Sequence, residues 1–264
     1  MQEADRENIA DLDLLVDAAK EGGQIALSYF GNNPRTWMKE GDSPVSVADI
    51  EVDEFLADTL RRARPEYGWL SEETEDDLSR LDNARIFVVD PIDGTRAFLE
   101  GRTEWCLSLA VVENQRPAAG VIYCPVRDEM FTAVIGQGAF LNGERITVGE
   151  LDTLNGANVA GPKTLLDSQE AKASGLVYAP YIRSLAYRFA MVAAGRLDAG
   201  MARARARDWD LAAADVLLAE AGGQLVDMHG NRLLYNKSTT KHPALLASAR
   251  GLFNKLQVMA TTYE

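Results

Sequence analysis

The sequence predicts a mixed α+β fold built in layers, and three observations carry this expectation. Apolar residues recur at helical spacing in the first 65 residues, short strand-like runs follow, and helix and strand alternate from residue 184 onward. The 264-residue chain has 47% apolar side chains, enough for a large buried core. We expect one unit over residues 1–264, with subdomains 1–150 and 151–264 within it.

Two helices are predicted in the N-terminal part of the chain. The first covers residues 6–30 and ends at the segment "GNNP", whose residues disfavour a helix. Ser46 is a suitable N-cap for the second helix, because Asp49 follows three residues later as in a capping box. This helix is expected to extend to about Arg64, since Pro65 follows.

Strands dominate the middle of the chain. Polar turns separate apolar runs of strand type at 85–90, 105–113, 118–126 and 129–136. Asn142–Gly143 is a tight-turn signal. Beyond these runs we expect, in order, a helix at 184–196, an extended segment at 198–206, a glycine-capped helix at 210–223, strands at 223–228 and 244–249, and a terminal helix from about 250.

Composition narrows the range of partners and compartments. The net charge of −13 disfavours binding to nucleic acid polymers or to anionic membranes. The N-terminus lacks the features of a signal peptide and no apolar run approaches membrane-spanning length, so a cytoplasmic location is expected. Cys106 and Cys124 lie in apolar runs, as buried free thiols do. His229 and His242 are too few for a histidine-rich zinc site.

Acidic residues gather at the ends of predicted elements. In "IFVVDPIDGTRAF" an apolar run leads into Asp90 and Asp93, two carboxylates that repel each other unless a cation lies between them. Glu72 and Glu73 follow another short apolar run, and Asp210 begins a helix. Each alone has an ordinary explanation, a solvated face or a helix cap. Together they offer the oxygen ligands that a hard divalent cation requires.

The turn after the strand at 85–90 has a second property. It can present the Asp90 and Asp93 carboxylates and the Ile92 carbonyl to one small volume. The backbone amides of Gly94 and Thr95 follow and can point at an oxyanion where a helix begins. Cations and amides side by side predict phosphoryl hydrolysis assisted by two metal ions.

Three segments resemble the signatures of a known family. "WLSEE", "VVDPIDGTRAFLEG" and "WDLAAADVLLAEAGG", in this order and spacing, look like those of the inositol monophosphatase superfamily, and the resemblance extends from about Lys39 to Gly223. It implies a layered αβαβα sandwich and a Mg²⁺-dependent phosphomonoesterase with two or three ions per site. It also implies lithium sensitivity, a small anionic phosphate ester as substrate, and a homodimer.

The resemblance also implies roles for the acidic positions. The metal ligands are Glu72, Asp90, the Ile92 carbonyl, Asp93 and Asp210, with Asp90 shared between two ions. Glu73 contacts the site through water or a third, weaker ion, and Asp49 with the Thr95 hydroxyl orients the attacking water. The substrate contacts are Asp93, Gly94 and Thr95.

The substrate itself is left open. "KEGDSPVSVAD" resembles the bisphosphate-nucleotidase and histidinol-phosphatase branches of the superfamily. Arg203 stands seven residues before Asp210, where inositol monophosphatases tend to carry a glutamate that holds the polyol. All three activities, inositol monophosphatase, bisphosphate nucleotidase and histidinol-phosphatase, are therefore carried forward.

Arginines near this position favour a substrate with additional negative charge. If residues 198–206 are extended, Arg203, Arg205 and Arg207 share one face and can bind a second anionic group. The alternative is a solvated edge or a dimer contact. Arg188, on the preceding helix, is a further candidate substrate contact.

Rival chemistries fit the sequence less well. Haloacid-dehalogenase-type phosphatases need two aspartates separated by one residue, whereas two residues separate Asp90 from Asp93. Cysteine phosphatases need an arginine six positions after the cysteine, and neither Cys106 nor Cys124 has one. No Walker loop occurs. A protein that senses phosphate esters without turnover stays an alternative, although the complete set of acids favours hydrolysis.

Overall fold

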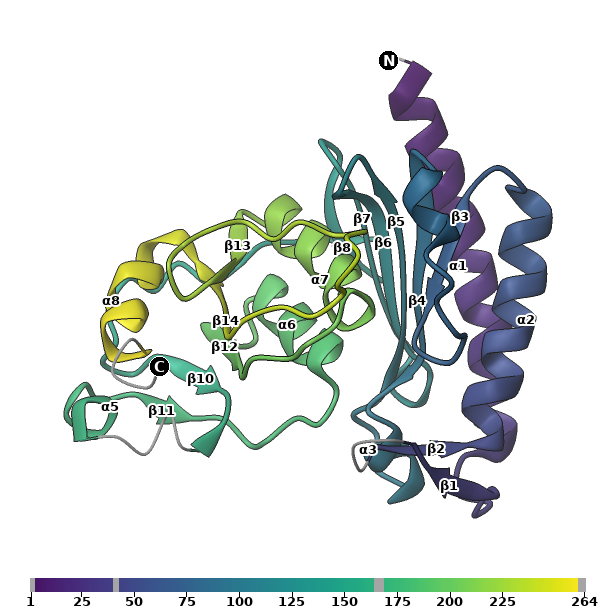
Figure 1. Cartoon of the computed structure of the whole chain (residues 1–264). Helices are drawn as coiled ribbons and strands as arrows, with labels where there is room; N and C mark the ends of the chain where they lie inside the picture. Colours follow the sequence, from purple (N-terminus) through teal and green to yellow (C-terminus); the bar gives the residue numbers. More distant parts are fainter. Residues whose placement is uncertain (1–2, 40–42, 164–168, 261–264) are drawn as a thin grey trace.

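The computed structural model describes residues 3–39, 43–163 and 169–260, and its layers alternate between helix and sheet (Figure 1). Helices α1 (Glu3–Tyr29) and α2 (Val47–Ala63) cover the outer face of a seven-stranded sheet. Helices α6 (Leu185–Ala193) and α7 (Asp208–Glu220) separate that sheet from a five-stranded one, and α8 (Arg250–Ala260) packs beyond it. The αβαβα sandwich is therefore confirmed.

The seven-stranded sheet holds the strands predicted for the middle of the chain. In spatial order they are β3 (Gly68–Ser71), β4 (Arg85–Asp93), β5 (Cys106–Glu113), β6 (Arg116–Cys124), β7 (Glu129–Val134), β8 (Gly138–Leu141) and β9 (Glu144–Ile146). Only the β3–β4 pair is parallel among these neighbours. Asn142 and Gly143 form the predicted tight turn between β8 and β9, both with positive φ.

The five-stranded sheet is built from the C-terminal half of the chain. Its spatial order is β11 (Val177–Tyr178), β10 (Asn158–Ala160), β12 (Ala199–Ala202), β14 (Leu245–Ala249) and β13 (Gly223–Asp227). Short elements complete the fold: a hairpin of β1 (Thr36–Met38) and β2 (Pro44–Ser46), helices α3 (Thr95–Leu99) and α5 (Gln169–Ala173), and single 3₁₀ turns at Ser79–Asp82 and Pro125–Arg127.

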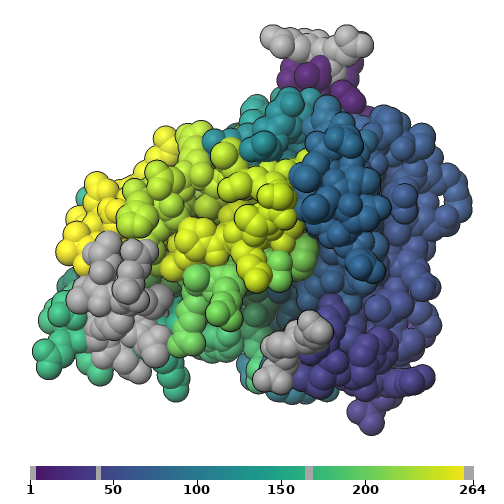
Figure 2. Space-filling model, in the orientation of Figure 1, coloured from purple at the N-terminus to yellow at the C-terminus, as the bar shows by residue number. Residues whose placement is uncertain are grey.

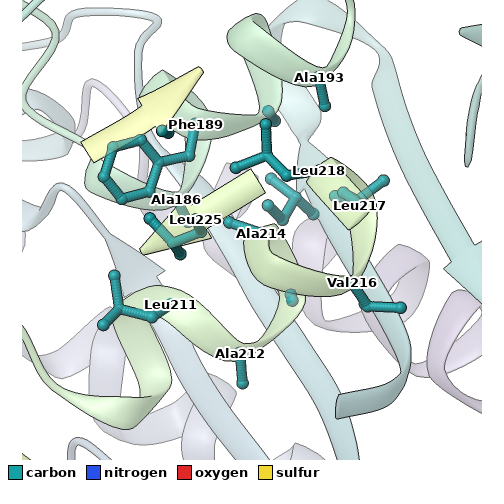
Figure 3. Packing of buried hydrophobic residues seen from close by; sticks show 14 of the residues in the cluster. Ala186, Phe189, Ala193, Leu211, Ala212, Ala214, Val216, Leu217, Leu218 and Leu225 are labelled. Carbon is teal, nitrogen blue, oxygen red and sulfur yellow. The ribbon is translucent and has the colours of Figure 1, made fainter. Parts of the chain in front are cut away.

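Helix α7 is buried because it lies between the two sheets. Its sequence, "DWDLAAADVLLAE", is apolar on nearly every side, as a fully enclosed helix requires. Figure 3 shows Leu211, Leu217 and Leu218 of α7 in the same buried cluster as Phe189 of α6. A Cβ atom on Gly120 of β6 would lie 2.9 Å from the Ala213 backbone, so glycine permits this close approach. The packing fixes the start of α7 beside β4 and β5.

Contacts between distant segments continue to the surface. Arg80 donates hydrogen bonds to Asn236 Oδ1 at 2.6 Å and to the Lys237 carbonyl at 3.0 Å. Figure 2 shows the two segments adjoining, one blue and the other yellow.

A subdivision at residue 150 stays a prediction. Within the described ranges, no helix has the length and apolarity needed to cross a bilayer. Cys106 and Cys124 are buried and free, as expected.

Candidate active site

The parallel pair β3–β4 brings two acidic positions to one edge of the large sheet. Ser71 pairs with Val89, and the Glu72 amide donates to the Val89 carbonyl at 3.2 Å. Glu72 therefore leaves β3 beside Asp90 of β4. This is the carboxyl end of both strands, where α/β proteins commonly place their ligands.

Three carboxylates converge at this edge. One oxygen each of Glu72, Asp90 and Asp210 lies within 4.8 Å of the others. Asp210 comes from the first turn of α7, and its Oδ2 atom accepts a hydrogen bond from the Arg207 amide at 2.6 Å. A cluster of three carboxylate oxygens at this spacing fits a hard divalent cation, which takes oxygen ligands.

The cluster is electrostatically unfavourable without a cation. Asp90 is 1% exposed, and burial raises its pKa well above the ordinary value, with further contributions from the charges of Glu72, Asp93 and Asp210. Burial also raises the pKa of Asp210. Because a bound divalent cation favours the charged form of every ligand, these residues fit a metal site and would hold the ion in their ionised form.

Asp93 is held differently from the other acids. Its Oδ2 atom accepts hydrogen bonds from the Ser184 hydroxyl at 2.7 Å and from the Ala186 amide at 2.6 Å, at the start of α6. A register shift in the β4–β5 ladder falls between Asp90 and Asp93. Asp93 lies outside the three-carboxylate cluster but lines the same cavity of about 220 Å³. Burial raises its pKa to about 6.

Asp49 and Thr95 are brought together by the predicted helix cap. Ser46 caps α2, and its amide donates to Asp49 Oδ2 at 2.8 Å in a capping box. The other oxygen, Oδ1, lies 3.0 Å from the Thr95 hydroxyl, which is also 3.1 Å from the Ile92 carbonyl. A helix cap thus fixes a buried carboxylate against a hydroxyl at the edge of the cavity.

Gly94 is required by both conformation and space. It adopts φ of 94°, and a Cβ atom there would lie 3.2 Å from Ser184 Cβ and 3.3 Å from the Glu104 carbonyl oxygen. Gly94 and Thr95 line the cavity together with Asp93. A side chain at position 94 would therefore be strained and crowded, so the turn that follows β4 requires a glycine.

Glu73 has a direct partner that the sequence did not indicate. Lys39 Nζ lies 2.6 Å from Glu73 Oε2 and 3.4 Å from Glu72 Oε1. An ammonium group therefore stands beside Glu73, where the family resemblance implied water or a third ion. Burial raises the pKa of Glu73 to about 7. Lys39 belongs to the quoted segment "KEGDSPVSVAD", but nothing in its spacing relates it to Glu73.

Two buried aspartates that the sequence did not single out position the site. Asp53 of α2 accepts hydrogen bonds from the Ser71 hydroxyl and, at 2.7 Å, from the Thr74 hydroxyl, which holds the segment carrying Glu72. Asp208 Oδ1 lies 2.7 Å from His242 Nε2, which fixes the start of α7. Neither residue belongs to a recognisable pattern, so only the packing identifies them.

The arginines at 203, 205 and 207 do not share a strand face, and that prediction was wrong. β12 ends at Ala202, and the chain then turns, with Arg205 at a left-handed φ of 93°. The Arg205 amide donates to the His242 carbonyl at 2.8 Å, so a neighbouring segment takes the place of a continued strand. Alternation of alanine and arginine does not distinguish a strand from such a turn.

Each of these arginines has different surroundings. Arg203 is exposed and lines a large cavity beside the carboxylate pocket. Arg188 of α6 lines the same cavity, but its side chain is buried. Arg207 donates to Thr240 Oγ1 at 2.9 Å and lines a separate cavity that also includes Glu72. Arg205 is exposed and lines neither the carboxylate pocket nor the large cavity.

We expect the metal-free protein to become more stable as the pH falls from about 7.5 to about 5. Buried Glu73 and Asp93, with pKa values raised to about 7 and about 6, bind protons in this window when folded, whereas the same carboxyls in the unfolded chain do not. The stabilisation is lost as the pH rises through these folded pKa values. Thermal unfolding in a chelator measures it, and higher stability at pH 7.5 than at pH 5.5 contradicts it.

The fold and the site together define a class of protein. Carboxylates gathered at strand ends beside a glycine turn and a carboxylate–hydroxyl pair, in an αβαβα sandwich, are the framework of a metal-assisted phosphoric monoester hydrolase. The chain matches the inositol monophosphatase family over residues 7–259 and belongs to that family.

Known relatives resemble the chain along most of its length. It is 34% identical over 231 residues to the Nus factor SuhB of Xylella fastidiosa, across 83% of this chain and 82% of that protein. It is also 34% identical over 231 residues to the inositol-1-monophosphatase of Rhizobium meliloti, across 83% of this chain and 86% of that protein. The crystal structure of the extragenic suppressor protein SuhB from Bartonella henselae superposes with a TM-score of 0.86 at 29% identity, across 97% and 100% of the two chains.

Proposed function

We propose that this protein hydrolyses small phosphate monoesters with Mg²⁺, as an inositol monophosphatase-like enzyme. One observation carries the proposal: Thr95, whose hydroxyl is hydrogen-bonded to the buried Asp49, lines the same cavity as Glu72 and Asp210 of the three-carboxylate cluster. Residues that would hold two or three ions are Glu72, Asp90, the Ile92 carbonyl, Asp93 and Asp210. When bound, Mg²⁺ supplies positive charge to the phosphoryl oxygens and the leaving oxygen and lowers the pKa of water.

The Asp49–Thr95 pair would position the attacking water. The Asp49 carboxylate accepts the hydroxyl proton of Thr95, which leaves the lone pairs of the Thr95 oxygen for a hydrogen bond from water. As the water attacks phosphorus, its proton passes to the Thr95 oxygen and the hydroxyl proton passes to Asp49. Burial raises the pKa of Asp49, which makes it a better proton acceptor at this point.

The turn at Gly94–Thr95 would receive the phosphate. Both residues line the 220 Å³ cavity, and the absence of a side chain at Gly94 lets an oxyanion approach the backbone amides. Asp93 lies on the same turn, with one oxygen held by Ser184 and Ala186. Its orientation is therefore fixed before substrate or metal arrives, which lowers the cost of assembling the site.

The test is phosphate release from inositol 1-phosphate with the purified protein. We expect turnover in Mg²⁺, none in excess chelator, and inhibition by millimolar Li⁺ through competition at a metal position. If the protein binds the ester in Mg²⁺ but releases no phosphate from any monoester tried, it is a sensor. Full turnover in chelator would contradict the assignment of the carboxylate cluster to metal.

We further propose a homodimer that acts in the cytoplasm. Apolar side chains near β11 support the dimer, because Val177, Tyr178 and Tyr181 are 50%, 42% and 57% exposed on one segment. The free thiols of Cys106 and Cys124 support a reducing compartment. Sedimentation that gives only a monomer at micromolar concentration would contradict the dimer, and fractionation of the cells of origin tests the compartment.

A further inference from the structure

A second cavity lies away from the carboxylate pocket. It opens between the start of β6, the second half of α7 and β13, which is an edge strand of the five-stranded sheet. Its volume is about 360 Å³, within the range of about 300–1,000 Å³ that binding sites for small molecules commonly have. No described residue lines both this cavity and the carboxylate pocket or the large cavity beside that pocket. It is therefore a separate candidate site.

Much of the wall of this cavity is apolar. Ile135, which follows β7, is 53% exposed, so apolar surface stays in contact with water there. The other apolar lining residues are Pro117 of β6, Val216 and Ala219 of α7, and Leu225 and Val226 of β13. An apolar group bound in the cavity would remove part of this surface from water, which favours binding.

Asp215 of α7 brings a carboxylate to the cavity. Its Oδ2 atom accepts a hydrogen bond from the Tyr235 hydroxyl at 3.0 Å. Among the described residues, no donor is bonded to its Oδ1 atom, and this oxygen is accessible to solvent. Burial raises the pKa of Asp215 to about 6, so the group is ionised at pH 7.5 but less stably than in water. A positively charged donor at Oδ1 would offset that cost.

Three guanidinium groups line the same cavity as Asp215. They belong to Arg116 at the start of β6, Arg232 after β13 and Arg250 at the start of α8, and all three side chains are exposed. Arg116 is anchored, because its Nη1 atom donates to the Leu233 carbonyl at 2.6 Å. The arginines therefore place positive charge beside a carboxylate that has a free oxygen.

These opposite charges do not pair with one another. The charges of Arg116 and Arg232 lower the pKa of Asp215, so both groups lie near it. Within the described part of the chain, however, Asp215 forms no ion pair, unlike Asp11, which lies 3.0 Å from Arg85. A gap therefore separates the carboxylate from the guanidinium groups, and a bound molecule with charges of both signs would fill it.

The remaining charged group of the cavity is already satisfied. Glu220 accepts hydrogen bonds from the Gly136 amide at 2.8 Å through Oε1 and from the Gly138 amide at 2.7 Å through Oε2. Both of its oxygens thus hold the turn between β7 and β8. Asp215 is the acid that presents a free oxygen to a ligand, and the arginines are the cations that face it.

From this arrangement we infer that the cavity binds a free α-amino acid with an apolar side chain. The ammonium group meets Asp215 Oδ1, the carboxylate meets Arg116 and Arg232, and the side chain lies on the apolar wall. A simple anion would be repelled by Asp215, and a simple cation by three guanidinium groups. An α-amino acid carries both charges close together and so matches both partners. The inference does not depend on the proposed function.

Calorimetric titration of the full chain in Mg²⁺, without any phosphate ester, tests the inference. The ligands are leucine, isoleucine, methionine and phenylalanine, and we expect at least one to bind with a Kd of about 1 mM or lower. If none of the four shows saturable binding up to about 10 mM, the cavity holds only water and the inference is overturned. Because binding is measured directly, failure of the hydrolase assignment would leave this result unaffected.

Analogues that lack one charge test the two polar contacts. For leucine these are 4-methylpentanoate, which has no ammonium group, and 3-methylbutylamine, which has no carboxylate. We expect each to bind at least about tenfold more weakly than the amino acid, the scale of a hydrogen bond between charged groups. An analogue that binds as tightly as the amino acid shows that one of the two contacts does not exist, and that result contradicts the inference.

Asp215→Asn assigns the ammonium contact to this cavity. The amide keeps an oxygen for the Tyr235 hydroxyl but loses the charge, so we expect amino acid affinity to fall at least about tenfold. Affinity for the analogue without an ammonium group should not fall. Asp13→Asn, on the exposed face of α1, is the control, and equal affinities of the two variants would place the binding site elsewhere.

Arg232→Ala tests the carboxylate contact without disturbing the interior. The side chain is exposed, so the melting temperature without ligand should be unchanged, whereas amino acid affinity should fall about tenfold. Arg61→Ala, an exposed arginine of α2 outside the cavity, is the matched control and should bind as the unaltered protein does. Full affinity in Arg232→Ala contradicts the proposed carboxylate contact.

Discussion

Asp90→Asn is expected to reduce Mg²⁺-dependent phosphate release by at least roughly a thousandfold, about 4 kcal/mol of transition-state stabilisation. Asp90 is the acid that lies with both Glu72 and Asp210 in the cluster and follows Val89 directly in β4. An amide of nearly the same volume loses the charge that holds a divalent cation. Initial rates of phosphate release at saturating Mg²⁺ measure the effect.

The same substitution is expected to stabilise the protein when no metal is present. Asp90 is buried among three other carboxylates, so a neutral amide removes repulsion that the folded state otherwise contains. In chelator the melting temperature of Asp90→Asn should therefore exceed that of the unaltered protein, and in Mg²⁺ the order should reverse. Asp13→Asn, on the exposed face of α1, is the control and should change neither quantity.

Two other results for Asp90→Asn would each contradict a different part of this prediction. If Asp90→Asn loses activity but is also destabilised in chelator, the carboxylate has a structural hydrogen-bonding role that outweighs the repulsion. If it keeps more than about a tenth of the activity, Asp90 is not a shared ligand and the metal site is wrongly placed.

Thr95→Val is expected to lower kcat by about a hundredfold to a thousandfold with little change in fold or metal binding. Valine keeps the shape of threonine but lacks the hydroxyl that lies 3.0 Å from Asp49 Oδ1. Without that hydroxyl, Asp49 has no route by which to take a proton from the attacking water. Single-turnover rates of phosphate release test this directly, because they report the chemical step rather than product release.

Thr95→Ser is the matched control for this prediction. Serine retains the hydroxyl and loses only a methyl group, so we expect at least about a third of the original kcat. If Thr95→Val is as active as Thr95→Ser, the Asp49–Thr95 pair serves only to hold α2 against the turn after β4. The attacking water would then be oriented by other groups in the cavity.

The sequence was a good guide where local chemistry decides structure. Ser46 and Asp49 form a capping box because both partners lie within one turn of α2, and Asn142–Gly143 turns because both tolerate positive φ. The apolar run before Asp90 forms a fully buried strand. These features depend on residues close together in the chain, so they can be predicted from the sequence without knowing which other segments pack against them.

Features that depend on contacts between distant segments were not predictable in this way. Lys39 meets Glu73 because the β1–β2 hairpin lies near the end of β3, and Ser184 meets Asp93 because α6 packs across the large sheet. Residues 198–206 were predicted as extended, but the strand ends at Ala202, and the following backbone turns and pairs with the chain around His242. Alternating small and charged residues permit either geometry, and only that neighbour decides between them.

By itself, therefore, the sequence determined the layered α+β fold, its family and the acids that form the cluster, because strand ends, caps and signature segments are local patterns. Tertiary structure alone decided that Arg188 is buried against the backbone carbonyls of Ile182 and Met201, that Arg203 and Arg207 line different cavities, and that Asp53 and Asp208 support the site. The physical reason is that burial and electrostatic pairing depend on which elements pack together, and residue spacing within one element does not specify its neighbours.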